Sequence, residues 1–168
     1  MKKILFVCSG NTCRSPLAEG IARKFLSKRT PVSTEISSAG ASALEGKPAS
    51  QHAVTVAAAR GVDLSKHRAR LLNSSMVREA DLIVAMGSKH KETVGVIDPE
   101  AAAYTVLMTH FCDIVGDVPD PIGGTREEYE RIYDVIELCV EAMAEHLEGY
   151  GGWKTGSESD GENTRESP

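Results

Sequence analysis

The chain has 168 residues, of which 41% are hydrophobic and 26% charged, and this is the size and composition of one globular domain with a core of its own. Its net charge of −5 and the lack of a basic block argue against a nucleic acid as partner. The apolar run behind Met1, Lys2 and Lys3 covers only 4–7, which is too short for a membrane span or a signal-peptide core. We therefore expect a cytoplasmic monomer that has no membrane partner.

The predicted elements alternate between strand and helix. Short buried runs and period-2 alternation indicate strands, whereas 3.6-residue periodicity and caps indicate helices. In chain order we expect a strand at 2–7, a helix at 15–28, a strand at 32–37, a helix at 48–61, a strand at 81–86, a helix from 88, a strand at 104–108 and a helix from 125. This order predicts an α/β domain with a parallel sheet, whose ligands bind beyond the carboxyl ends of the strands.

Two of these helices have recognisable starts. Ser15 is placed to cap the first helix, with Pro16 at its first position. Thr125 and Glu128 form a capping-box pattern at the start of the last helix.

The composition changes after residue 150. Residues 151–168 hold one large apolar residue, Trp153, among Gly, Ser, Asp, Glu, Asn and Thr. Such a segment cannot bury enough apolar surface to fold alone. We expect a folded domain over 1–150 and a disordered acidic tail over 151–168.

The chain has four cysteines, and they have neither metal-ligand spacing nor the density of a disulfide framework: Cys8, Cys13, Cys112 and Cys139. This usage is typical of a reducing compartment and predicts no metal site. Cys112 is expected to pack in a loop, and Cys139 in the core, because it lies on the apolar face of the last helix.

The segment VCSGNTCRSPLAE (7–19) places a thiol at the end of the first strand, just before a helix. Backbone N–H groups and the helix dipole converge at such a loop and bind anions. A thiol there loses its proton readily, and the thiolate is a nucleophile. Arg14 offers a planar fork that can hold two phosphate oxygens. Cys8 and Arg14 thus predict a phosphate site with a nucleophile at its floor.

The rest of the loop fits the same role. Gly10 allows backbone angles that a side chain would forbid, Asn11 can hold the shape of the loop, and Ser15 can donate to the sulfur of Cys8. We expect the phosphate to be bound by the whole run Ser9, Gly10, Asn11, Thr12, Cys13, Arg14 and Ser15.

CSGNTCRSP followed by LAE resembles the signature C-x-G-N-x-C-R-S-P-x-A-E of the low-molecular-weight protein tyrosine phosphatase family. The resemblance continues in the family's order over about residues 2 to 148, with SAG (38–40), HRAR (67–70), DLIVAM (81–86) followed by His90, and DPIGG (120–124). It implies a four-stranded parallel sheet flanked by helices on both faces, with flavodoxin-like layering.

The resemblance also implies a two-step reaction on phosphorylated proteins that needs no metal or cofactor. Cys8 attacks phosphorus and forms a phosphocysteine, while Asp120 protonates the leaving group and then activates water. Asp113 and Asp117 are competing carboxylates by position alone. The Asp-Pro pair that matches the family selects Asp120.

Further roles follow from the resemblance alone. Ser38 and His67 are expected to support Asn11 by hydrogen bonds, and Cys13 to form a reversible, protective disulfide with Cys8. His90 and His52 are expected to be structural or solvated.

Two departures from the family's tyrosine-directed members concern the substrate. Thr12 stands where those members tend to have an aliphatic residue, and Ile122, Gly123 and Gly124 stand where they tend to have an aromatic wall. Both features resemble the bacterial protein-arginine phosphatase branch. We favour protein phosphoarginine as substrate, with phosphotyrosine as the alternative.

Two rival functions are weaker. A thiol-dependent arsenate reductase would need further cysteines near the loop, and HRAR (67–70) has none. A non-catalytic phosphate-binding or redox module would have no use for the acid Asp120.

Overall fold

The computed structural model describes residues 1–29 and 33–150, so the predicted tail lies outside the described residues. Along the chain the structure has β1 (Lys2–Cys8), α1 (Arg14–Arg29), β2 (Thr34–Gly40), α2 (Gln51–Ala59), α3 (Ser74–Glu79), β3 (Leu82–Ala85), α4 (Ser88–Ile97), the 3-10 helix η1 (Pro99–Tyr104), β4 (Thr105–Leu107), the 3-10 helix η2 (Met108–Cys112) and α5 (Arg126–Tyr150).

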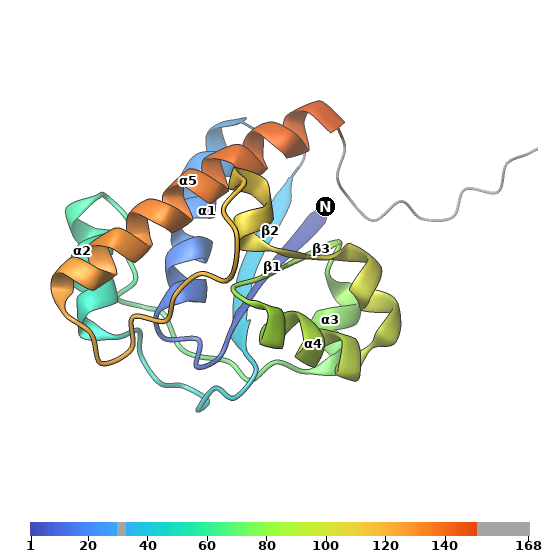
Figure 1. Ribbon diagram of the computed structural model, residues 1–168, viewed down its shortest axis with the longest axis horizontal. Coiled ribbons are helices and arrows are strands. Elements are labelled where there is room, and N and C mark those ends of the chain that lie inside the picture. Colours follow the sequence, from blue (N-terminus) through green and yellow to red (C-terminus); the bar gives the residue numbers. More distant parts are fainter. Residues whose placement is uncertain (30–32, 151–168) are drawn as a thin grey trace, which may run out of the picture.

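The four strands form one parallel sheet in the order β2-β1-β3-β4. Alternate residues of β1 face opposite sides of this sheet. Ile4 and Phe6 pack with α1, α2 and α5, whereas Leu5 and Val7 pack with α3 and α4. Figure 1 shows the helices in these two layers, with the sheet between them. The predicted fold, four parallel strands with helices on both faces, is confirmed.

The register brings the loop after β1 next to the ends of its two neighbours. Cys8 of β1 pairs with Gly40 of β2, and Val7 pairs with Ala85 of β3. A side-chain carbon at Gly40 would lie 2.5 Å from the backbone oxygen of Ser9, so only glycine allows β2 to approach the loop this closely.

Several predicted boundaries were wrong. The helix predicted at 48–61 lies at Gln51–Ala59, because Ser50 caps it by accepting from the backbone N–H of Ala53. The second strand lies at 34–40 instead of 32–37, because the small residues after 37 continue the pairing with β1 through Gly40. The first helix begins at Arg14, so Ser15 lies inside it and caps nothing; its hydroxyl faces Cys8. The capping box of α5 is confirmed, because the backbone N–H of Thr125 donates to Glu128 and that of Glu128 donates to the Thr125 hydroxyl.

Cys139 lies in the core as predicted, but the sequence analysis did not predict the disulfide that it forms with Cys112. Cys112 at the end of η2 is bonded to Cys139 of α5, with their Cα atoms 5.0 Å apart. This separation lies within the range that a disulfide spans. Two residues 27 positions apart in sequence meet here because η2 packs against α5, which the sequence pattern could not reveal. Cys8 and Cys13 are free and buried.

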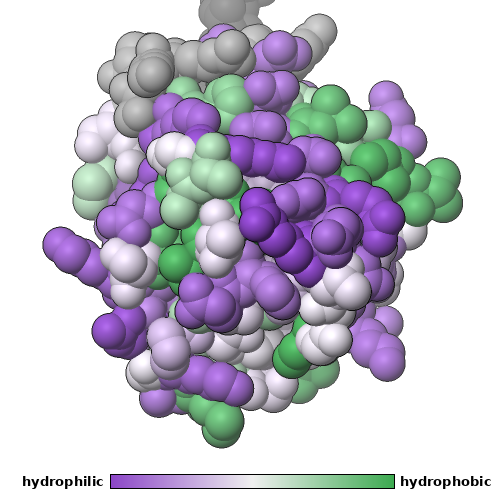
Figure 2. Space-filling view, turned by 90° about the vertical axis from the view of Figure 1, so that its left-hand side faces the viewer, coloured by the Kyte–Doolittle hydropathy of each residue, from purple (hydrophilic) through white to green (hydrophobic). Residues whose placement is uncertain are grey.

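The surface that Figure 2 shows is largely polar, with apolar residues in separate patches. Among the described residues, no helix has both the length and the apolar character that a membrane crossing requires.

Candidate active site

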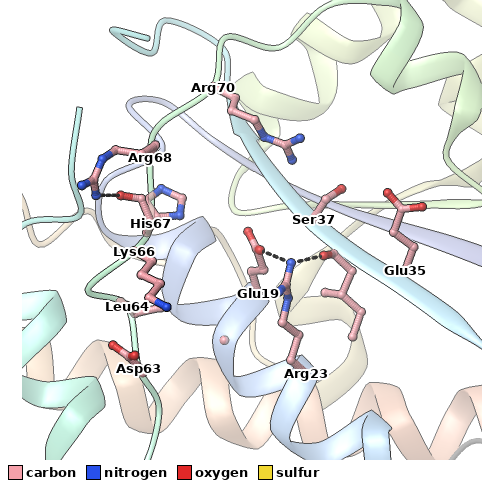
Figure 3. Close-up of a pocket in the computed structure, with 12 residues that line it drawn as sticks. Glu19, Arg23, Glu35, Ser37, Asp63, Leu64, Lys66, His67, Arg68 and Arg70 are labelled. Carbon is pink, nitrogen blue, oxygen red and sulfur yellow. Dashed lines mark hydrogen bonds and ion pairs between the residues drawn. The ribbon is translucent and has the colours of Figure 1, made fainter. Parts of the chain in front are cut away.

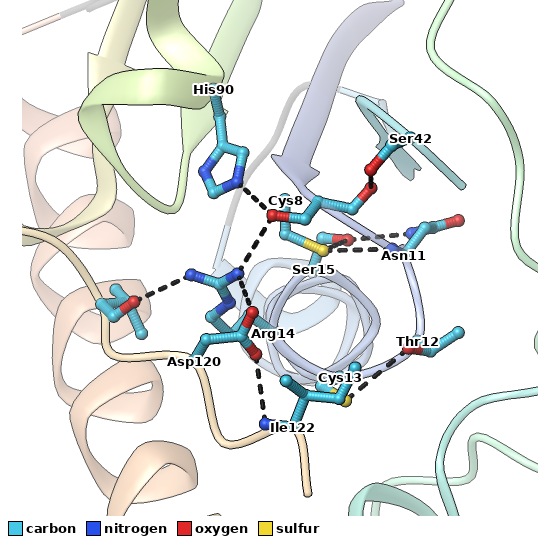
Figure 4. Close-up of polar contacts among 12 residues, drawn as sticks. Cys8, Asn11, Thr12, Cys13, Arg14, Ser15, Ser42, His90, Asp120 and Ile122 are labelled. Carbon is cyan, nitrogen blue, oxygen red and sulfur yellow. Dashed lines mark hydrogen bonds and ion pairs between the residues drawn. The ribbon is translucent and has the colours of Figure 1, made fainter.

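The loop between β1 and α1 surrounds the sulfur of Cys8 (Figure 4). The backbone N–H of Asn11 donates to Cys8 Sγ over 3.2 Å, and the hydroxyl of Ser15 lies 3.0 Å from the same atom. The thiol is buried at the N-terminal end of α1, a helix of 16 residues. Hydrogen-bond donors and the helix dipole both stabilise a negative charge at this sulfur.

Asn11 holds the loop in its shape. Its backbone has φ of 54°, in the left-handed region that asparagine tolerates better than most residues. Its side-chain amide donates to the hydroxyls of Ser15 and Ser38, each over 2.9 Å, and its oxygen accepts from the backbone N–H of Arg70. His67 Nε2 lies 2.8 Å from the Asn11 carbonyl oxygen. Ser38 and His67 therefore both contact Asn11, where the resemblance placed them.

A second layer supports this network from behind. The Ser38 hydroxyl donates to Glu19 over 2.5 Å, and Glu19 pairs with Arg23 over 2.6 Å. Glu19 and Arg23, with His67, line a polar hollow of about 390 Å³ on the side of α1 and β2 (Figure 3). The sequence analysis assigned no role to Glu19, although its place in the LAE signature was the signal that could have found it.

Arg14 connects the loop to the segment before α5. Only 6% of it is exposed. Its Nη1 donates to the carbonyl oxygen of Val118 over 3.0 Å, while Nη2 pairs with Asp120 Oδ2 at 2.7 Å and lies 3.4 Å from the Ser9 hydroxyl. Its buried Nε has no hydrogen-bond partner among the described residues, which leaves a donor for an oxyanion.

The three competing carboxylates have different surroundings. Asp120 faces Arg14 and is partly exposed. Asp117 instead caps α4, because its Oδ1 accepts from both the backbone N–H and the hydroxyl of Ser88. Asp113 ends η2 in a left-handed conformation with φ of 54°. Of the three, Asp120 is the one that lies against the phosphate loop.

Thr12 and Cys13 lie on the side of the loop that faces α2 and α5. Cys13 Sγ lies 3.1 Å from the Tyr129 hydroxyl and donates to Ser50 Oγ over 3.4 Å, and the backbone N–H of Ser50 donates to the Thr12 carbonyl. Burial and the contact with Cys13 raise the pKa of Tyr129 to about 12. The sequence analysis assigned no role to Ser50 or Tyr129, because the contacts of both with Cys13 join distant parts of the chain.

His90 was expected to be structural or solvated, and in the structure it is buried and not solvated. Only 7% of His90 is exposed, and its Nε2 lies 2.8 Å from Ser9 Oγ in the loop. Burial and the nearby Arg14 charge lower its pKa, against smaller opposing effects of Asp117 and Asp120. His52 is exposed, and the centroid of its ring lies 5.4 Å from the centroid of the Tyr129 ring.

Comparison with known proteins identifies the family. The model of the family described as low molecular weight phosphotyrosine protein phosphatase matches residues 3–150. The chain belongs to this family. The resemblance found in the sequence is thereby confirmed, and the protein is a hydrolase of the phosphatase class.

Members of the low molecular weight phosphatase family that are named for different activities are similarly close to this chain. The protein-tyrosine-phosphatase Wzb of Salmonella typhi is 36% identical over 150 residues, which cover 89% of this chain and 97% of that protein. The protein-arginine-phosphatase of Geobacillus stearothermophilus is 37% identical over 147 residues, 87% of this chain and 96% of that one. The structure of Wzb from Escherichia coli K30 with sulphate has a TM-score of 0.80 and 35% identity, covering 87% and 98% of the two chains.

Proposed function

We propose that this member of the family is a protein-arginine phosphatase that works through a phosphocysteine. The observation that carries the chemistry is the ion pair of Arg14 with Asp120 beside the loop that holds Cys8. It supports the proposal because the thiol of Cys8, the guanidinium of Arg14 and the carboxyl of Asp120 can serve as nucleophile, phosphate-binding fork and acid in one site. The reaction that follows needs no group from outside the chain except water.

In the first step the thiolate of Cys8 attacks phosphorus. An S–P bond forms, the P–N bond of phosphoarginine breaks, and Asp120 gives a proton to the leaving nitrogen. In the second step the Asp120 carboxylate takes a proton from water, whose oxygen bonds to phosphorus while the S–P bond breaks. Inorganic phosphate leaves and the thiolate returns, stabilised by the N–H of Asn11 and the hydroxyl of Ser15.

Arg14 and Asp120 must exchange partners during this cycle. In the structure Nη2 of Arg14 pairs with Asp120. Phosphoryl oxygens compete for the same nitrogen, and a guanidinium binds them in two parallel hydrogen bonds. Substrate binding therefore frees Asp120 to face the leaving group.

The preference for phosphoarginine rests on the walls of the site. Thr12 is 8% exposed, and its hydroxyl lies over the loop, 3.5 Å from the place of a methyl group added at Gly10. It offers a polar partner to a guanidinium group or to the attacking water. Leu44 and Ile122 are 70% and 69% exposed and are aliphatic, whereas a flat phenol ring is held best by aromatic walls.

Phosphotyrosine is the second candidate, favoured by the relatives named protein-tyrosine-phosphatase. The deciding measurement compares turnover of two peptides of one sequence, one with phosphoarginine and one with phosphotyrosine. A higher kcat/KM on phosphoarginine is expected, and a higher value on phosphotyrosine would reverse the assignment. The Cys8→Ser variant, which keeps the loop but lacks the nucleophile, is the control for both and should be inactive.

We also propose that Cys13 protects Cys8 by a reversible disulfide. In the structure the two thiols have separate partners, Tyr129 and Ser50 for Cys13 and the loop for Cys8, so the bond requires Cys13 to leave Tyr129. Peroxide followed by a thiol should restore activity in the parent and far less in Cys13→Ser. Equal recovery would show that Cys13 protects nothing.

An arsenate reductase remains a weaker candidate, because Cys112 and Cys139, the two cysteines outside the loop, are bonded to each other. That the protein acts in the cytoplasm and as a monomer stays a prediction.

A further inference from the structure

A chain of hydrogen bonds runs from helix α4 to Arg14. His90 is the third residue of α4, and its Nε2 lies 2.8 Å from the hydroxyl of Ser9. The same hydroxyl oxygen lies 3.4 Å from Arg14 Nη2. Figure 4 shows dashed lines from His90 and from Arg14 that meet at one oxygen, and the contacts above identify it as that of Ser9. Asp120 pairs with the same Nη2 of Arg14. Ser9 is thus held between an imidazole and the group that binds phosphate.

The direction of each hydrogen bond follows from which of the three groups can donate and which can accept. A guanidinium can only donate, so the Ser9 oxygen accepts from Arg14. The single hydroxyl proton of Ser9 then needs an acceptor, and within the described part of the chain His90 Nε2 is its other partner. His90 therefore accepts at Nε2 and carries its own proton at Nδ1, which is buried and has no partner among the described residues.

Helix α4 is fixed in this position from both sides. The backbone N–H of Met86, before the helix, donates to the carbonyl oxygen of Val7 at the end of β1. Asp117 caps the first turn through Ser88. A side-chain carbon at Gly87 would lie 2.5 Å from Asp117, so glycine allows the close approach. The loop that carries the acid therefore also sets the place of His90.

We propose that His90 is a positioning residue: by accepting the Ser9 proton, it keeps the Ser9 oxygen turned toward Arg14 and so orients the guanidinium for the phosphoryl group. The inference rests on the proposed phosphatase function of this site. Nothing in the sequence-based assignment of the catalytic residues gave His90 such a role.

This role requires a neutral imidazole. The charged groups that face His90 are Arg14 from α1 and Asp117 and Asp120 from the loop before α5, and burial with Arg14 lowers its pKa despite the two carboxylates. A second proton, at Nε2, would make the Ser9 oxygen accept from two cations. The arrangement is therefore intact above the lowered pKa of His90 and is lost as the pH falls through it.

The test is a double-mutant cycle of Ser9→Ala and His90→Ala, assayed with the aryl substrate p-nitrophenyl phosphate and with inorganic vanadate as inhibitor. Each single variant should lower kcat/KM about tenfold and weaken vanadate binding, and the double variant should be no worse than either. Additive losses, or a folded His90→Ala with the parent's kcat/KM, would overturn the proposal.

Two further variants separate positioning from folding. His90→Gln keeps a neutral hydrogen-bond acceptor near the position of Nε2, so it should recover most of the activity that His90→Ala loses. Because glutamine does not titrate, the loss of activity at low pH that comes from protonation of His90 should be absent in this variant. Failure of this rescue, or an unchanged acid limb, counts against the proposal.

Val94→Ala, a buried change on α4 away from Ser9, should lower the urea midpoint while kcat stays at the parent's value. A kcat loss as large as that of His90→Ala would overturn the proposal. The proposed phosphocysteine chemistry itself is tested separately, and it fails if Cys8→Ser turns over substrate.

Discussion

At the scale of single residues, the site is held together by groups that must change partners. The pair of Arg14 and Asp120 joins a buried cation to a partly exposed carboxylate, with side-chain exposures of 7% and 40%. Such a pair contributes little stability by itself, since the exposed partner is screened by water. In the proposed reaction, its importance lies in aligning the guanidinium of Arg14 before the phosphoryl group arrives.

The first prediction tests whether the proton donor is Asp120 or the neighbouring Asp117. Asp120→Asn removes the proton donor without changing size, so kcat should fall about 100-fold or more on substrates with poor leaving groups and much less on activated aryl phosphates. Asp117→Asn is the matched control, because asparagine caps a helix as well as aspartate does. Rates with a series of leaving groups check this. If the leaving-group dependence appears in Asp117→Asn instead, the acid is Asp117.

The second prediction concerns Thr12, whose hydroxyl decides the polarity of the site next to the loop. Thr12→Ile replaces a hydroxyl by apolar carbon and should move the preference from phosphoarginine toward phosphotyrosine by about 1–3 kcal/mol, the scale of one pocket contact. The ratio of kcat/KM on the two peptides measures it. An unchanged ratio would mean that Thr12 does not determine the substrate.

At the scale of elements, the accuracy of the sequence predictions follows the range of the interactions. β1, the capping box of α5 and the loop with Cys8 and Arg14 depend on neighbours in sequence, and they were predicted. α3 was missed because its six residues, capped by Asn73, are too few to show a period. Contacts that join distant segments, such as Ser9 with His90, carry no local signal.

The cap of α4 gives a prediction at this scale. Asp117→Ala leaves the first N–H groups of α4 without the carboxylate, which should lower the free energy of unfolding by about 1 kcal/mol. Since α4 carries His90, we also expect a moderate loss of kcat/KM with no change in leaving-group dependence. Urea unfolding of Asp117→Ala beside Asp117→Asn measures the first effect. Equal midpoints for the two variants would show that the cap contributes nothing.

At the scale of the whole molecule, one covalent link joins the two ends of the segment that carries the acid. Cys112 precedes this segment and Cys139 lies in α5, which follows it. The segment has further anchors, because the Thr109 hydroxyl donates to the carbonyl oxygen of Gly116 and Asp117 binds Ser88. Stability should therefore depend on the disulfide more than catalysis does.

The last prediction tests this separation. Cys112→Ser opens the loop of 27 residues that the disulfide closes. Because the unfolded chain then gains conformational freedom, the free energy of unfolding should fall by about 3 kcal/mol. Cys139 keeps its buried place in the core. The kcat should change less than twofold, since the other anchors remain. Urea unfolding with and without a thiol reductant measures the difference: the reductant should lower the midpoint of the parent to that of Cys112→Ser and leave the variant unchanged. If the parent is insensitive to the reductant and no more stable than Cys112→Ser, the disulfide does not form in solution. The segment that carries Asp120 would then be held by its hydrogen bonds alone.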